Sequence, residues 1–173
     1  PLGVAANTIF AVYGLAEASL AVSFAAPGGA LLSQDFSRAQ LGLGQTVSTV
    51  TDSDNRNQAV TLVSLGTPLQ DCEVKIVDDQ GEICDEAQVG HNLIKGLNVT
   101  RGYYRQPRIN QNTFTADHWL KTGDIGFFYQ AELYLTGRAK ELLVINGINY
   151  YPHDLEQVAD KLPGHTIDQV AVT

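Results

Sequence analysis

The chain has 173 residues, of which 44% are apolar, and carries a formal net charge of −8 at pH 7. This length supplies one sizeable hydrophobic core or parts of two, and the apolar content excludes an intrinsically disordered protein. The acidic balance argues against nucleic acid or an anionic membrane surface as a partner, and no apolar run approaches the roughly 20 residues that span a bilayer, so we expect a cytoplasmic protein.

Two short strands and a long polar stretch are predicted in the N-terminal third of the chain. Residues 7–12 form a β-branched and aromatic run that predicts a strand ending at Tyr13, and the alanine and leucine content after Gly14 favours a helical turn. Residues 27–59 are rich in Gly, Ser, Thr, Gln, Asp and Asn, which is typical of a loop-rich or poorly ordered segment. The apolar run 60–64 then predicts the second strand.

The middle of the chain predicts a compact β-subdomain. Residues 73–77 alternate between polar and apolar side chains, and a DDQG turn joins them to a second short strand at 81–84. Short strands with close turns indicate a small β-barrel or sandwich, which we place at about 60–138. Residues 108–114 follow a proline and predict a short helix within this region.

The stretch 119–156 contains most of the residues suited to chemistry. Asp124 lies between two glycines in TGDIG, which predicts a tight turn that holds its carboxylate off any strand, ready to bind a diol. Residues 132–136 alternate as a strand, and Arg138 follows a glycine expected to end that strand. Taken alone, the pattern is equally consistent with Asp124 as a turn-forming residue and Arg138 as a solvated cation.

A second, smaller unit is predicted after Arg138. The apolar run 142–145 and the Asn-Gly pair at 146–147 suggest a hairpin, and residues 154–162 have the apolar spacing of an amphipathic helix closed by Pro-Gly. The fold class expected for the whole chain is therefore α+β, with a β-subdomain followed by the start of a small α+β domain.

Three motifs in this order, TGDIG, GRAKE and NGINYYPHDLE, resemble the adenylate-forming superfamily of acyl-CoA synthetases, luciferases and fatty acyl-AMP ligases. The YYPHDLE ending is most similar to the fatty acyl-AMP ligases. The resemblance implies that Asp124 binds the ribose hydroxyls of ATP and that Arg138 binds the same nucleotide near ribose and phosphate. It also implies that Lys140 is the hinge about which a small C-terminal domain rotates. Residues 1–138 would then be the end of the large domain and 139–173 the hinge and beginning of the small one.

The segment YGLAEA resembles the YGxTE motif of the same superfamily. The resemblance implies that Tyr13 stacks on adenine, that Gly14 belongs to the nucleotide site and that Glu17 coordinates Mg²⁺, which prefers hard oxygen ligands. Ala16 replaces the threonine that contacts phosphate, a substitution common in fatty acyl-AMP ligases. Spacing alone favours a surface glutamate that follows a core tyrosine.

Two other segments bear on the subfamily. The stretch 27–59 resembles an insertion of fatty acyl-AMP ligases that restrains the mobile C-terminal domain, although a plain variable loop has the same composition. His91 and Asn92 stand where the related motif VGEIWVKG has Glu-Ile, and we expect His91 to be a solvated histidine at a strand end.

The chain has no methionine, begins with Pro1 and ends in an apolar run at Thr173, so we expect it to be an internal piece of a longer polypeptide. Cys72 and Cys84 flank the predicted hairpin and could form a cross-strand disulfide, but two thiols in an acidic, enzyme-like chain are more often reduced. By resemblance, the phosphate-binding loop would precede Pro1 and the catalytic lysine would follow Thr173. The piece alone is therefore expected to be inactive.

The resemblance implies that the full-length protein activates a fatty acid with ATP and Mg²⁺ to an acyl-adenylate and releases pyrophosphate. The acyl group would pass to the pantetheine of an acyl carrier protein or polyketide synthase. A fatty acyl-CoA synthetase, which shares the nucleotide site, remains an alternative. So does a degenerate domain kept for binding or assembly, since Ala16, His91 and Asn92 depart from the pattern.

Overall fold

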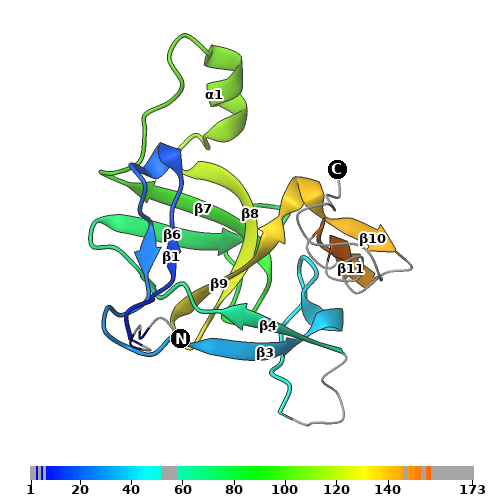
Figure 1. The fold of residues 1–173 in the computed structure, drawn as a ribbon. Coiled ribbons are helices and arrows are strands. Elements are labelled where there is room, and N and C mark those ends of the chain that lie inside the picture. Colours follow the sequence, from blue (N-terminus) through cyan, green and yellow to red (C-terminus); the bar gives the residue numbers. More distant parts are fainter. Residues whose placement is uncertain are drawn as a thin grey trace.

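A four-stranded antiparallel sheet, ordered β6-β7-β8-β9, forms the centre of the molecule in the computed structural model (Figure 1). The structure describes residues 3, 5, 7–51, 58–145, 148–152 and 155–156. The strands of the central sheet are β6 Cys72–Val77, β7 Gly90–Gly96, β8 Leu120–Tyr129 and β9 Glu132–Arg138. Its two edge strands are not paired with each other in the part of the chain described, so the sheet is open and the expected barrel does not close.

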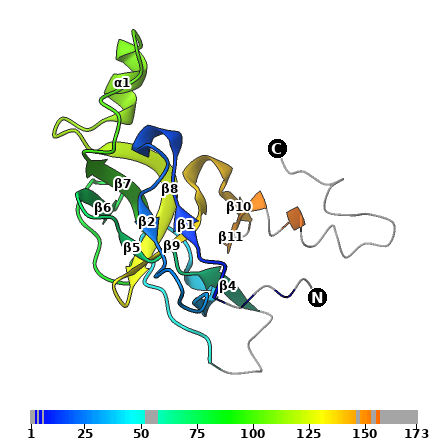
Figure 2. The same ribbon diagram turned by 60° about the vertical axis from the view of Figure 1, so that its left-hand side comes forward.

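Three smaller β-units and one helix surround this sheet (Figures 1 and 2). The units are ordered β1-β2-β5, β3-β4 and β10-β11. Their strands are β1 Val12–Tyr13, β2 Ser23–Phe24, β3 Ser33–Ser37, β4 Ala59–Val63, β5 Thr67–Pro68, β10 Leu143–Ile145 and β11 Ile148–Tyr150. The helix is α1 Pro107–Thr113, and 3-10 turns occupy Ala16–Ala18, Arg38–Gln40 and Ala139–Glu141.

The β8-β9 hairpin fixes which residues face one another at the end of the sheet. Gln130 and Ala131 both have positive φ, 52° and 63°, as a two-residue hairpin turn requires. The register that follows pairs Asp124 with Arg138, after a β-bulge between Ile125 and Gly126. The turn chemistry at one end of the hairpin thus brings a carboxylate and a guanidinium together at the other.

Apolar side chains pack on both faces of the central sheet. One cluster joins Ile76, Ile94, Leu120 and Leu133 to Tyr13 of β1. The other contains an aromatic group in which Phe36 of β3 meets Phe127 and Tyr134 edge to face, at centroid distances of 5.0 and 5.3 Å. Such aromatic pairs contribute beyond their buried area, and they attach β3 to the β8-β9 hairpin.

Several predictions are confirmed. A helix follows Pro107, a helical turn follows Gly14, strands occupy most of 60–64 and 73–77, and β10 pairs with β11 as a hairpin. The predicted turn at 146–147 and nearly all of the helix at 154–162 lie outside the described residues. Cys72 and Cys84 are free thiols.

Other predictions were wrong. No strand runs over 7–12, where β1 begins only at Val12. Asp124 lies inside β8 instead of in a turn, because Gly123, with φ of 81°, and the bulge absorb the irregularity without ending the strand. Gly137 likewise lies within β9. The stretch 27–59 is loop-rich in its described part, as expected, and also contains β3 and a 3-10 turn.

The described part of the chain is sheet-rich with few helical residues, and the expected barrel is not closed. Within that part, no helix has both the length and the hydropathy needed to cross a bilayer.

Candidate functional site

A pocket of about 410 Å³ lies where β8 begins and β9 ends, between the turn after β1 and the loop that precedes α1. It is lined by the five residues that the sequence assigned to nucleotide and metal, Tyr13, Gly14, Glu17, Asp124 and Arg138. Its volume falls in the range of about 300–1,000 Å³ typical of small-molecule sites. Residues more than 120 positions apart in the sequence therefore meet in one concave site.

Asp124 is the most constrained of these residues. Its Oδ2 accepts a hydrogen bond of 2.6 Å from the hydroxyl of Tyr13, and its Oδ1 lies 3.3 Å from Nε of Arg138. Its backbone N–H donates to Oγ1 of Thr122, which in turn donates to the backbone carbonyl of Asn92 on the neighbouring strand. With its side chain 13% exposed, the carboxylate is held in one orientation at the pocket wall.

Tyr13 serves as a neutral hydrogen-bond donor to this carboxylate. Burial of the phenol, reinforced by its hydrogen bond to Asp124 and by the charge of that residue, raises the pKa of Tyr13 well above its usual range. The phenol therefore stays protonated at any physiological pH. Its ring is part of the core as well as of the pocket wall, which links the site to the packing of the sheet.

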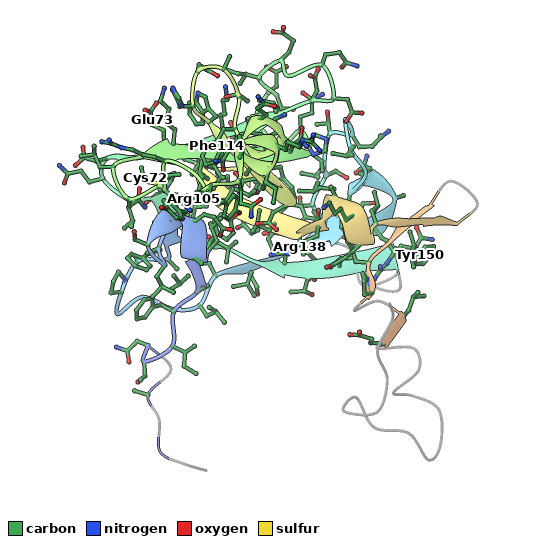
Figure 3. The ribbon with its side chains drawn as sticks, turned by 90° about the horizontal axis from the view of Figure 1, so that it is seen from above. Cys72, Glu73, Arg105, Phe114, Arg138 and Tyr150 are labelled. Carbon is green, nitrogen blue, oxygen red and sulfur yellow. The ribbon has the colours of Figure 1, made fainter. Side chains whose placement is uncertain are left out.

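Arg138 ends β9 and is 65% exposed, so its guanidinium remains accessible to a ligand (Figure 3). Because a surface ion pair is screened by water, its contact with Asp124 orients the two groups more than it stabilises the fold. Lys140 lies two residues further on in the 3-10 turn Ala139–Glu141 between β9 and β10, and it is exposed. Lys140 does not line the pocket, whereas the adjacent Glu141 does.

Gly14 and Glu17 occupy the tight connection after β1. A Cβ on Gly14 would lie 1.6 Å from the carbonyl oxygen of Leu20, so only glycine allows the chain to fold back so closely. Glu17 follows in the 3-10 turn Ala16–Ala18, and its Oε1 accepts a hydrogen bond of 2.6 Å from the hydroxyl of Tyr103. This bond lowers the pKa of Glu17, because it favours the charged carboxylate.

Sequence reasoning missed Tyr103, which also lines the pocket. The only local signal was an aromatic pair after a glycine in RGYYRQP. Nothing in that signal distinguishes Tyr103 from Tyr104, whose side chain points into solvent and is 83% exposed.

His91 and Asn92, which replace the Glu-Ile pair of the related motif, have different surroundings. His91 pairs with Asp79 at 2.9 Å, on a partly exposed surface outside the pocket that contains Asp124. Asn92 is buried, and neither atom of its amide makes a hydrogen bond of normal geometry. The amide lies beside the hydroxyl of Tyr13, where it counteracts a small part of the rise in the pKa of that residue.

Comparison with known protein families identifies the family of this chain. The sequence profile of the AMP-binding enzyme family matches residues 2–104, which is more than half of the chain. The chain belongs to the AMP-binding enzyme family. The matched range includes Tyr13, Gly14, Glu17 and Tyr103.

Individual relatives of this AMP-binding enzyme match between 71% and 99% of the chain. A 4-hydroxyphenylalkanoate adenylyltransferase of Mycobacterium bovis is 37% identical over 99% of this chain and 29% of its own length. A 2-succinylbenzoate–CoA ligase of Enterococcus faecalis is 41% identical over 71% of this chain and 25% of its own length. A solved structure from a study of fatty acyl-adenylate ligases of E. coli and L. pneumophila superposes with a TM-score of 0.83, at 30% identity over 95% of this chain and 29% of that one. The AMP-binding chain thus spans less than a third of the proteins that it matches.

Proposed function

We propose that the full-length protein is a fatty acyl-AMP ligase, which joins a fatty acid to ATP as an acyl-adenylate and releases pyrophosphate. The observation that carries this proposal is the convergence of Tyr13, Glu17, Asp124 and Arg138 on one pocket. Relatives named as an adenylyltransferase and a structural neighbour described as a fatty acyl-adenylate ligase support the same reaction.

The pocket residues suit the parts of ATP in the following way. Asp124, held by Tyr13 and by its own backbone contacts, presents a fixed carboxylate that can accept hydrogen bonds from the two ribose hydroxyls. Tyr13 offers a ring in the pocket wall for the adenine. Arg138 places a mobile cation within reach of ribose and phosphate, where negative charge increases during attack on the α-phosphate.

The donor set at Glu17 fits Mg²⁺. Glu17 contributes a carboxylate whose Oε1 is engaged by Tyr103, while carboxylates and phosphates provide the hard oxygen ligands that this ion prefers. When bound, Mg²⁺ would neutralise phosphate charge. In the described residues no cluster of three or more acidic, histidine or cysteine side chains could hold a metal by protein ligands alone, which is consistent with an ion bound mainly through the nucleotide.

The division into domains is part of the proposal. Residues 1–138 would form the end of the large domain and 139–173 the start of a small domain that rotates about Lys140. The β11 strand, beyond the proposed hinge, packs against the 3-10 turn Arg38–Gln40, which belongs to the stretch 27–59. This contact supports an insertion that restrains the small domain, and hence a carrier-protein acceptor in preference to CoA.

The nucleotide site is tested by Asp124→Ala in the full-length protein. We expect ATP affinity to fall by about 10-fold or more, because hydrogen bonds to a charged group contribute roughly 1.5–3 kcal/mol. Asp85→Ala is the matched control, since Asp85 is an exposed carboxylate outside the pocket. Calorimetric titration with ATP measures both variants, and equal affinities would refute the assignment.

The acceptor is tested separately with fatty acid, ATP and CoA. The proposed ligase accumulates acyl-adenylate and forms acyl-CoA slowly, whereas rapid acyl-CoA formation would show a fatty acyl-CoA synthetase. Failure to form any adenylate, together with intact ATP binding, would indicate a domain that binds without catalysis.

A further inference from the structure

We propose that Tyr103, held in place by Asn110, is a positioning residue that orients the carboxylate of Glu17 in the nucleotide pocket. The inference rests on the proposed function, in which Glu17 binds Mg²⁺ beside the phosphates of ATP. It adds a pair of residues from a distant loop and helix to a site otherwise built from the strand ends and the turn after β1.

The loop that carries Tyr103 holds Glu17 at two points. The hydroxyl of Tyr103 donates to Oε1 of Glu17 at 2.6 Å, and the backbone N–H of Thr100 donates to the carbonyl oxygen of Glu17 at 2.7 Å. Both Tyr103 and Glu17 line the same pocket. One bond fixes the backbone of Glu17 and the other its side chain, so the carboxylate has a defined direction.

Asn110 in α1 fixes the position of Tyr103 in turn. The backbone N–H of Tyr103 donates to Oδ1 of Asn110 at 2.7 Å, and Nδ2 of Asn110 donates to the carbonyl oxygen of Tyr103 at 2.9 Å. Two bonds in opposite directions between one amide and one residue leave little freedom to either. A Cβ on Gly102 would lie 3.0 Å from that amide, which shows how closely the loop packs against Asn110.

The figures show the same arrangement at the level of the elements. The loop and α1 rise from the end of the central sheet beside the 3-10 turn that carries Glu17 (Figures 1 and 2). Arg105 and Phe114, which flank α1, mark its place close to that turn in the view from above (Figure 3).

The chemistry of this contact suits a metal ligand. A phenol that donates to Oε1 leaves Oε2 available and keeps the carboxylate ionised, since a hydrogen bond to the charged form stabilises it. Tyr104 is the natural comparison, because it is the adjacent tyrosine and stacks near Arg105, at 5.2 Å from the ring centroid, without lining the pocket.

The test compares Tyr103→Phe with Tyr104→Phe in the full-length protein. Binding of Mn²⁺, as a paramagnetic substitute for Mg²⁺, is measured by electron paramagnetic resonance in the presence of a non-hydrolysable ATP analogue. We expect Tyr103→Phe to weaken Mn²⁺ binding about 3- to 10-fold, the lower range for a hydrogen bond to a partly exposed charged group. Tyr104→Phe is expected to match the wild type.

The lineshape of bound Mn²⁺ provides a second readout that a purely structural role would not change. A Glu17 carboxylate that Tyr103 no longer orients can bind Mn²⁺ in more than one geometry, so the resonance signal of bound Mn²⁺ should broaden in Tyr103→Phe only. Asn110→Ala should move both readouts in the same direction by a smaller amount. Equal Mn²⁺ binding by the two tyrosine variants would overturn the inference.

Glu17→Gln separates this inference from the proposed function. If Glu17→Gln leaves Mn²⁺ binding unchanged, Glu17 is not a metal ligand, and the proposed role of Glu17 and this inference both fail. If Glu17→Gln weakens Mn²⁺ binding while Tyr103→Phe does not, only the positioning role is wrong.

Discussion

Removal of one hydroxyl, in Tyr13→Phe, tests whether the buried phenol fixes the carboxylate of Asp124, which we propose binds the nucleotide. The phenyl ring keeps its place in the core, so the change removes mainly the 2.6 Å hydrogen bond to Asp124. A hydrogen bond to a charged acceptor contributes about 1.5–3 kcal/mol, and water from the adjoining pocket can replace part of it. We therefore expect a loss of about 1.5–2 kcal/mol in the free energy of unfolding.

The same change should affect binding, because the Asp124 side chain loses the contact that orients its Oδ2 and keeps the contact of its Oδ1 with the exposed Arg138. We expect ATP affinity to fall about 3- to 10-fold, less than in Asp124→Ala, since the carboxylate itself remains. Denaturant unfolding and calorimetric titration measure the two effects on the same samples. Tyr104→Phe controls for the loss of a tyrosine hydroxyl elsewhere.

A double-mutant cycle with Asp124→Ala decides whether the two residues act together. If the phenol acts through the carboxylate, the double variant should lose about 1 kcal/mol less stability than the sum of the single variants. Additivity within about 0.3–0.5 kcal/mol would refute the reasoning, as would a Tyr13→Phe protein that unfolds and binds ATP like the wild type.

Three further predictions follow from particular positions. Gly137→Ala would place a Cβ 2.3 Å from the ring of Tyr151, so we expect the free energy of unfolding, measured with denaturant, to fall by about 2–4 kcal/mol. Gly44 has a positive φ of 77° but open space around it, so Gly44→Ala should lower the same free energy by about 1 kcal/mol. Equal losses in the two variants would contradict the overlap with Tyr151. Asn92→Leu removes a buried amide without hydrogen-bond partners and should leave stability unchanged or raise it by about 1 kcal/mol, whereas a clear loss would show that the amide is bonded. Lys140→Pro fixes φ near −65° at the proposed hinge, so it should abolish either adenylation or acyl transfer while the other reaction persists. If the ratio of the adenylation rate to the transfer rate is unchanged in both Lys140→Pro and Lys140→Ala, the hinge assignment is wrong.

Local patterns in the sequence predicted the elements that depend on local chemistry. Residues within a few positions of one another were sufficient to predict three elements: the helix after Pro107, the β10-β11 hairpin and the alternating strand β6. The glycines around Asp124 predicted a tight turn, whereas the structure has only a positive φ at Gly123 and a bulge after Ile125. Pairing with β7 and β9 nevertheless keeps Asp124 in a strand, which no local pattern indicates.

Contacts between distant residues account for what was missed. Phe36 stands alone among polar neighbours, so the composition of 27–59 predicted a loop-rich segment. The strand β3 forms there through its pairing with β4 and the packing of Phe36 against Phe127 and Tyr134. Tyr103 reaches Glu17 across 86 positions, and Tyr13 reaches Asp124 across 111. The candidate residues could be identified from motifs, but the hydrogen bonds that orient them could not.

Tyr151 lies beyond the proposed hinge and is only 4% exposed, with its hydroxyl 2.7 Å from Oγ1 of Thr136 in β9 and its ring against Gly137. A buried tyrosine of about 150–200 Å² contributes roughly 4 kcal/mol at 25 cal/mol per Å². A rotated arrangement that exposed this ring would therefore be populated by only about one molecule in a thousand. A ligand or acceptor that selected the rotated state would have to favour it by a similar free energy. The burial of one aromatic ring would therefore set how strongly a partner must bind before the proposed small domain rotates.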